Sequence, residues 1–106
     1  MSELCEVVIT APDPEWLRAF TRKLVEDGLC ASVHNFTPVL SIYRWHGDLQ
    51  ERTEGRASLH TSRGRVAEIV ERANQEHPYE VPGISARPII DGNPDDLAWI
   101  VEETQP

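Results

Sequence analysis

The sequence has 106 residues, enough for one hydrophobic core, so we expect a single domain over residues 1–106. Hydrophobic residues make up 40% and charged residues 26% of the chain, which excludes a disordered or collagen-like protein and a disulfide-rich miniprotein. With 10 Lys and Arg against 18 Asp and Glu, the net charge is -8, and we therefore expect no nucleic-acid partner.

Residues 4–28 predict a strand followed by a helix. Residues 4–10 are rich in β-branched side chains and end at Ala11-Pro12, a pattern typical of a largely buried strand. Asp13-Pro14-Glu15 then supplies an N-cap, a first-turn proline and an acidic residue, and Gly28 marks the helix end. The apolar residues between them recur at helical spacing and predict an amphipathic helix: Trp16, Leu17, Phe20, Leu24 and Val25.

Residues 29–61 predict two strands joined by a turn near His46-Gly47-Asp48, because the apolar period changes to two. Pro38 lacks an N–H for a sheet ladder, so we expect a bend, a bulge or an edge position there. The side chains expected to face the core are Ala31, Val33, Leu40, Ile42, Ala57 and Leu59.

The last third of the chain predicts a helix, an irregular strand and a second helix. Residues 62–76 have a helical apolar period that Pro78 ends. Residues 79–90 predict an extended segment, interrupted by Pro82-Gly83 and Pro88, at a sheet edge. Asn93-Pro94-Asp95-Asp96 then repeats the cap, proline and acid of a helix start.

This order of elements predicts a ferredoxin-like α+β sandwich, β-α-β-β-α-β, with an antiparallel sheet, two helices on one face and an added C-terminal helix. The long hairpin would overhang so small a sheet, exposing unpaired backbone groups and aromatic side chains such as Tyr43 and Trp45. We therefore expect a homo-oligomer.

Targeting and redox features favour a cytoplasmic protein without a membrane partner. No apolar run is long enough to span a bilayer, and the first residues lack a basic and apolar leader. Cys5 and Cys30 are then expected to remain reduced.

Three segments resemble the CutA divalent-ion tolerance family: Ser41-Ile42-Tyr43-Arg44-Trp45-His46-Gly47, His77-Pro78-Tyr79-Glu80-Val81-Pro82 and Gly92-Asn93-Pro94-Asp95-Asp96-Leu97-Ala98-Trp99-Ile100. The resemblance covers nearly the whole chain, starting at Val7-Val8-Ile9-Thr10-Ala11-Pro12-Asp13. It implies a ferredoxin-like subunit, a tight homotrimer related in architecture to PII signalling proteins, a connection with divalent metal ions and no enzymatic activity. The sequence also has no nucleophile elbow, P-loop or dinucleotide fingerprint.

The chain departs from the family's sequence pattern at two positions after the first helix and at one position at the end of the third strand. Ser32 stands where the family typically has Cys, and His34 stands where it has Asn. His60 replaces a Lys, so a permanent cation gives way to a group that can be neutral at pH 7.

The candidate metal ligands are His77, His60 and Glu80. Imidazole and carboxylate donors suit divalent metals, and His77 is held beside Pro78 at a helix end, although a histidine there also stabilises the helix dipole. Four histidines and two cysteines show no local chelating spacing, since Cys30 and His34 would lie about 13 Å apart on a strand. Tyr43, Trp45 and Tyr79 are expected to line a cleft or an interface between subunits.

Two functions are compatible with these residues. The first is a cytoplasmic homotrimer that weakly binds copper(II) or another divalent cation and contributes to divalent-cation tolerance. The alternative is a PII-like signalling or scaffold trimer that captures a small ligand or a partner protein in the same clefts. A third possibility is a stable structural trimer with no dedicated ligand.

Overall fold

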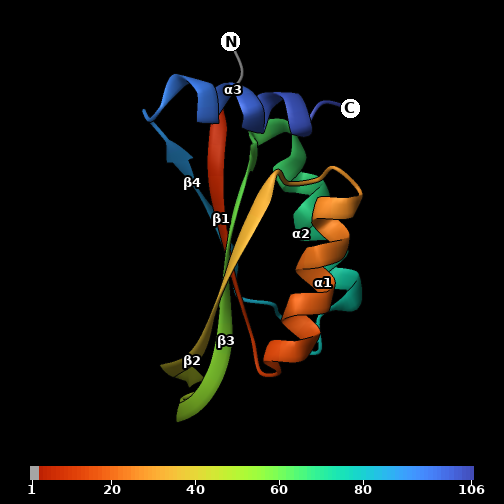
Figure 1. The fold of residues 1–106 in the computed structure, drawn as a ribbon. Helices are drawn as coiled ribbons and strands as arrows, with labels where there is room; N and C mark the ends of the chain where they lie inside the picture. The colour runs from red at the N-terminus through yellow and green to blue at the C-terminus, as the bar shows by residue number, and fades with distance from the viewer. Residues whose placement is uncertain (1–2) are drawn as a thin grey trace.

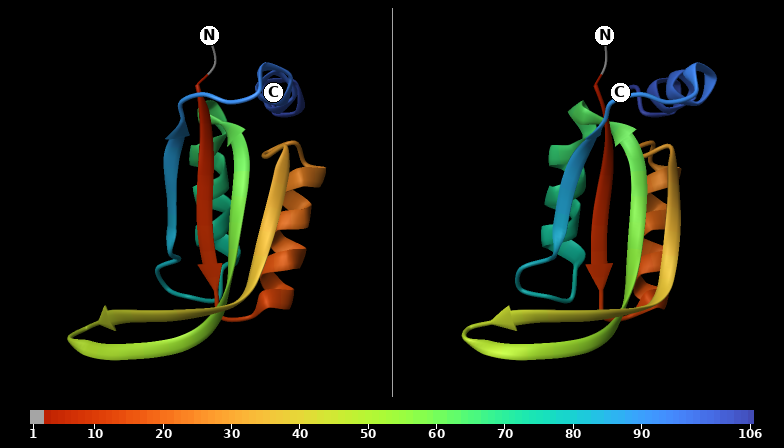
Figure 2. Two further views of the ribbon diagram at one scale, coloured as in Figure 1. Left: turned by 60° about the vertical axis from the view of Figure 1, so that its left-hand side comes forward. Right: turned by 90° about the vertical axis from the view of Figure 1, so that its left-hand side faces the viewer.

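The computed structural model describes residues 3–106 and confirms the predicted α+β fold (Figure 1). A four-stranded antiparallel sheet has the order β2-β3-β1-β4. Helices α1 and α2 lie on one face of the sheet, and α3 lies across one end of it (Figures 1 and 2). In chain order the elements are β1 (Leu4–Ala11), α1 (Pro14–Glu26), β2 (Ser32–Trp45), β3 (Asp48–Ser62), the 3-10 turn η1 (Arg63–Arg65), α2 (Val66–Glu76), β4 (Ile84–Ile89) and α3 (Pro94–Glu103).

The core lies between the sheet and the two helices on its covered face. Alternate residues of β1 and β3 point into it, because side chains on a strand alternate between faces. The helices contribute one stripe each, at the spacing that the sequence predicts, except that Val25 at the end of α1 is 37% exposed. Its fully or nearly buried members include Val7, Ile9, Ala11, Leu17, Phe20, Leu24, Ala57, Leu59, Ile69 and Ala73.

The ends of α1 are defined by local backbone chemistry. The Asp13 side chain accepts a hydrogen bond of 2.9 Å from the Glu15 amide, and Pro14 occupies the first turn. At the other end Gly28 has φ +72°, and the Leu29 amide donates to the Leu24 carbonyl at 2.9 Å. This Schellman arrangement needs a residue that tolerates positive φ, so glycine ends the helix.

The β2–β3 hairpin corrects one prediction, because Leu40 and Ile42 do not face the core. They are 63% and 60% exposed. Strand β1 pairs with β3 only up to Gly55, so beyond that point no third strand of residues 3–106 pairs with the hairpin, and neither α1 nor α2 covers it (Figure 2). It bends below the end of the sheet instead (Figure 2).

Proline explains the irregular parts of the sheet. The register between β2 and β3 shifts between Phe36 and Val39, so the bulge expected at Pro38 is confirmed. The extended segment predicted over residues 79–90 is a strand only from Ile84 to Ile89, with a loop before it.

Among residues 3–106, no helix has both the length and the apolar composition that crossing a bilayer requires.

Replacing Ile9 by Ala tests the position of the core. Ile9 is 1% exposed, so Ile9→Ala is expected to lower the free energy of unfolding by about 2–5 kcal/mol. The matched variant Ile90→Ala changes a side chain that is 93% exposed and is expected to cost no more than about 0.5 kcal/mol. Urea unfolding at one protein concentration measures both, and equal losses would contradict this core.

Candidate functional site

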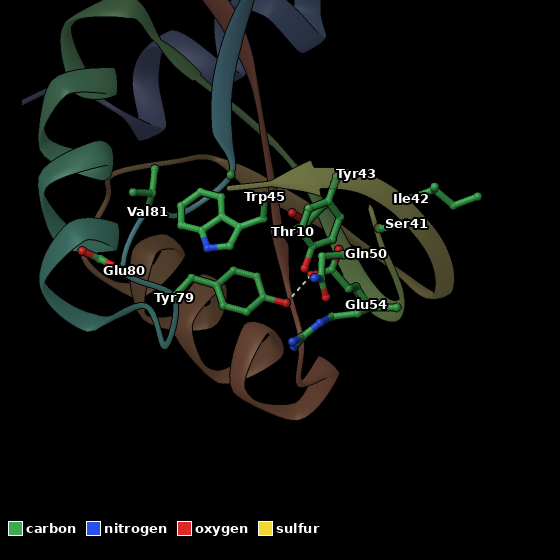
Figure 3. A pocket seen from close by; sticks show the side chains of 12 residues that line it. Thr10, Ser41, Ile42, Tyr43, Trp45, Gln50, Glu54, Tyr79, Glu80 and Val81 are labelled. Atoms are coloured by element: carbon green, nitrogen blue, oxygen red, sulfur yellow. Dashed lines mark hydrogen bonds between the residues drawn. The ribbon is translucent and has the colours of Figure 1, made fainter. Parts of the chain in front are cut away.

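The hairpin and the loop before β4 enclose a cleft of about 680 Å³ (Figure 3). We call it the hairpin cleft. It exists because the hairpin bends below the end of β1, where the loop also passes (Figure 2). Its walls bring together four residues singled out in the sequence: Tyr43, Trp45, Tyr79 and Glu80. The other lining residues are Thr10, Ser41, Ile42, Gln50, Arg52, Glu54, Val81 and Gly83.

A hydrogen bond between Tyr79 and Glu54 joins the two walls of the cleft. The Tyr79 hydroxyl donates to Glu54 Oε2 at 2.7 Å, as the dashed line in Figure 3 shows. Glu54 is only 3% exposed, so this donor compensates part of the cost of burying a carboxylate. The Arg52 guanidinium lies 5.9 Å from the centre of the Tyr79 ring. Sequence reasoning missed Glu54 and Arg52, since an isolated acid or base on a strand is usually solvated.

The pKa of Tyr79 lies well above its ordinary value. Burial of the phenol is the main cause, and the hydrogen bond to the Glu54 carboxylate adds to it, with a smaller contribution from Tyr43. The phenol therefore remains a proton donor at neutral and moderately alkaline pH. Its bond to Glu54 persists over the same range.

His77 has both ring nitrogens engaged inside the subunit. The Tyr79 amide donates to Nδ1 at 3.0 Å, which leaves Nε2 to carry the proton and donate to the Thr10 carbonyl at 2.7 Å. The ring is buried and lies edge-on to Trp16, with 5.0 Å between ring centroids. His77 thus fastens the start of the loop to the end of β1, and a metal ion would have to displace one of these bonds.

His60 lies on the face of the sheet opposite α1 and α2. It pairs in register with Glu6 of β1, whereas His77 contacts Thr10, four residues further along that strand, or about 13 Å. Over residues 3–106, the structure gathers no group of three or more His, Cys, Asp or Glu side chains suited to a metal ion. A single subunit therefore does not bring His77, His60 and Glu80 into one coordination sphere.

The thiols are also outside the cleft. Cys5 and Cys30 are free and buried. Burial raises the pKa of Cys30 to about 12, so this side chain stays a neutral thiol, and the thiolate is the form that binds metals. Cys30 is therefore a packing residue at neutral pH.

Tyr79→Phe tests the bond across the cleft through the pH dependence of stability. An unfolded tyrosine ionises near pH 10 while native Tyr79 keeps its proton, so the unfolded state binds fewer protons above that pH. The wild-type free energy of unfolding should then fall as pH rises above about 10, and Tyr79→Phe should fall less steeply. Urea unfolding at stepped pH measures the slopes of wild type and variant. Equal slopes for wild type and Tyr79→Phe would contradict the shift.

Comparison with known proteins assigns the chain to a family. Residues 5–103 match the family model for the CutA1 divalent ion tolerance protein. The chain is 39% identical over 98 residues to the divalent-cation tolerance protein CutA of Thermus thermophilus, covering 92% of this chain and 95% of that protein. It is 35% identical to a CutA homolog of Xenopus laevis, of which it spans 64%. A solved Thermus thermophilus structure, titled divalent cation tolerance protein (Cut A1), superposes with a TM-score of 0.91 at 38% identity, covering 99% of this chain and 100% of that one. The chain belongs to the CutA1 divalent ion tolerance protein family.

Proposed function

We propose that this protein contributes to divalent-cation tolerance as a homotrimer that binds a divalent transition metal ion, copper(II) first, weakly and without catalysis. Membership of the CutA1 divalent ion tolerance family carries the proposal, and the names of the matched relatives support it. The net charge of -8 attracts cations to the whole molecule, but specific binding needs convergent donors. The cytoplasmic location stays a prediction from the sequence.

The exposed apolar surface of the hairpin supports self-assembly. A monomer would leave five large apolar side chains of the two hairpin strands exposed to water, which is unfavourable. A second copy of the chain can cover them and pair with the free strand edge. The exposed side chains are Phe36, Leu40, Ile42, Trp45 and Leu49.

The donor groups around this surface support weak rather than tight metal binding. Glu80 is an exposed carboxylate on the wall of the hairpin cleft, and His60 is half-buried on the sheet face opposite α1 and α2. Imidazole nitrogen and carboxylate oxygen both suit copper(II) and zinc. In this proposal His60 of one subunit and Glu80 of another are ligands, and His77 is a positioning residue that holds the loop carrying Glu80.

The size and lining of the hairpin cleft support a second function, capture of a small organic ligand. A volume of about 680 Å³ lined by Tyr43, Trp45 and Tyr79, with Arg52 beside them, has the character of a small-molecule site. A thermal-shift screen of nucleotides and small carboxylates tests this alternative. It fails if none of them raises the melting temperature while copper(II) does.

Calorimetric titration with copper(II) tests the first function. Wild type is expected to show saturable binding that persists when NaCl is raised to about 0.5 M, because coordination, unlike attraction by net charge, is only weakly screened. Glu80→Gln should weaken binding, while Glu51→Gln, an exposed acid elsewhere on the hairpin, should not. Loss of the copper(II) binding heat at about 0.5 M NaCl would contradict the proposal.

His77→Ala separates positioning from ligation in the same experiment. It removes the bonds to the Thr10 carbonyl and the Tyr79 amide, so the melting temperature is expected to fall by several degrees. As a positioning residue, His77 should leave copper(II) affinity within about threefold, far less than the roughly tenfold or greater loss on removing a ligand. A loss of that size without a change in melting temperature would make His77 a ligand.

Ile42→Asp tests assembly through the hairpin. A charge placed on an apolar contact would be buried without a partner, so we expect the variant to run as a smaller species than wild type in size-exclusion chromatography with light scattering. Ala19→Asp places the same charge on the exposed surface of α1 and should leave the wild-type mass unchanged. An Ile42→Asp variant with the wild-type mass would contradict the assignment of this surface.

A further inference from the structure

Two histidines from neighbouring strands meet on the sheet face opposite α1 and α2. His60 of β3 pairs with Ser32 of β2, and His34 of β2 pairs with Ser58 of β3, so the two imidazoles are diagonal neighbours. Their ring centroids are 6.4 Å apart, with the rings at 72°. In the single subunit His34 is exposed and His60 is half-buried.

A carboxylate stands beside this pair. Glu6 of β1 is directly opposite His60. Its Oε2 accepts a hydrogen bond of 2.5 Å from the Ser58 hydroxyl, which fixes the carboxylate next to the imidazoles. On its other side, Glu6 Oε1 lies 3.9 Å from the Arg87 guanidinium of β4. Arg56, opposite Phe36 and Thr10, is a further charged residue on this face.

We propose that His34 and His60 form a two-nitrogen chelate for a divalent transition metal ion, copper(II) or zinc(II), with Glu6 as the adjacent carboxylate. A metal bonded to imidazole nitrogen at about 2.0–2.1 Å holds two ring centroids roughly 5–6 Å apart. The observed separation exceeds this by less than about 1.5 Å, a movement that rotation about the side-chain bonds of two accessible histidines supplies. The remaining coordination positions are open to water and to the Glu80 carboxylate of another subunit.

This site deepens the proposed function, on which it rests, by naming where the metal binds and which atoms hold it. Two protein nitrogens and open positions favour reversible binding, unlike the closed four-ligand sites of structural zinc. The site also does not use His77, whose nitrogens already serve Thr10 and Tyr79. The His34–His60 pair is therefore the best-placed pair of nitrogen donors in the subunit.

Copper(II) titration of His34→Gln, His60→Gln and the double variant tests the chelate. Both histidines bind one ion, so each single variant should lose at least about tenfold in affinity and the double variant little more. The matched control is His46→Gln, which removes an exposed histidine in the hairpin turn and should stay within about twofold of wild type. Circular dichroism of each metal-free variant verifies the fold.

Electron paramagnetic resonance of the copper(II) complex gives a readout that does not depend on variants. Wild type should show coupling to two imidazole nitrogens, and each single variant to one. Saturable wild-type binding that His34→Gln leaves unchanged, or a spectrum without two nitrogen couplings, overturns the chelate while the proposed metal-binding function stands. Absence of saturable binding of copper(II) and zinc(II) to wild type overturns both.

Discussion

The β2–β3 hairpin is longer than the sheet that could cover it, and this mismatch determines most of what the molecule can do. Strand β1 stops pairing at Gly55, so the rest of the hairpin continues alone and bends below the sheet (Figure 2). The bend has two consequences. It encloses the cleft against the loop before β4, and it leaves Leu40 and Ile42 in contact with water. The first consequence supplies a candidate site, and the second supplies the driving force for the association that we propose.

Hydrogen bonds within the subunit limit which side chains of the hairpin cleft can bind a ligand. Tyr79 and Glu54 bond across it, while His77 attaches the loop to β1 through both ring nitrogens. These side chains already form hydrogen bonds within the subunit, so they are poorly placed to bind a metal ion. The sheet face opposite α1 and α2 differs, since there His34 and His60 meet beside the Glu6 carboxylate. We therefore propose an organic ligand for the cleft and a metal ion for the sheet face.

The sequence predicted the features that depend on neighbours along the chain. The cap and proline of Asp13-Pro14, the terminating Gly28 and the bulge at Pro38 are local properties, and all are present. Contacts between distant segments were not predictable in this way. An apolar period of two indicates that Leu40 and Ile42 lie on the same face of a strand, but it does not indicate whether another element covers that face. The bonds of His77 likewise depend on the Thr10 carbonyl, 67 residues away. The pairing of His34 with His60 required the strand register, and the resemblance implied other residues at both positions.

The central claim is that the uncovered hairpin drives this chain to assemble. Sedimentation equilibrium of the metal-free wild-type protein at micromolar concentration tests it most directly. The account predicts a mass three times that of the 12.0 kDa chain, unchanged on tenfold dilution. A folded species with the mass of one chain would show that the hairpin is stable in water without a partner and would contradict the claim.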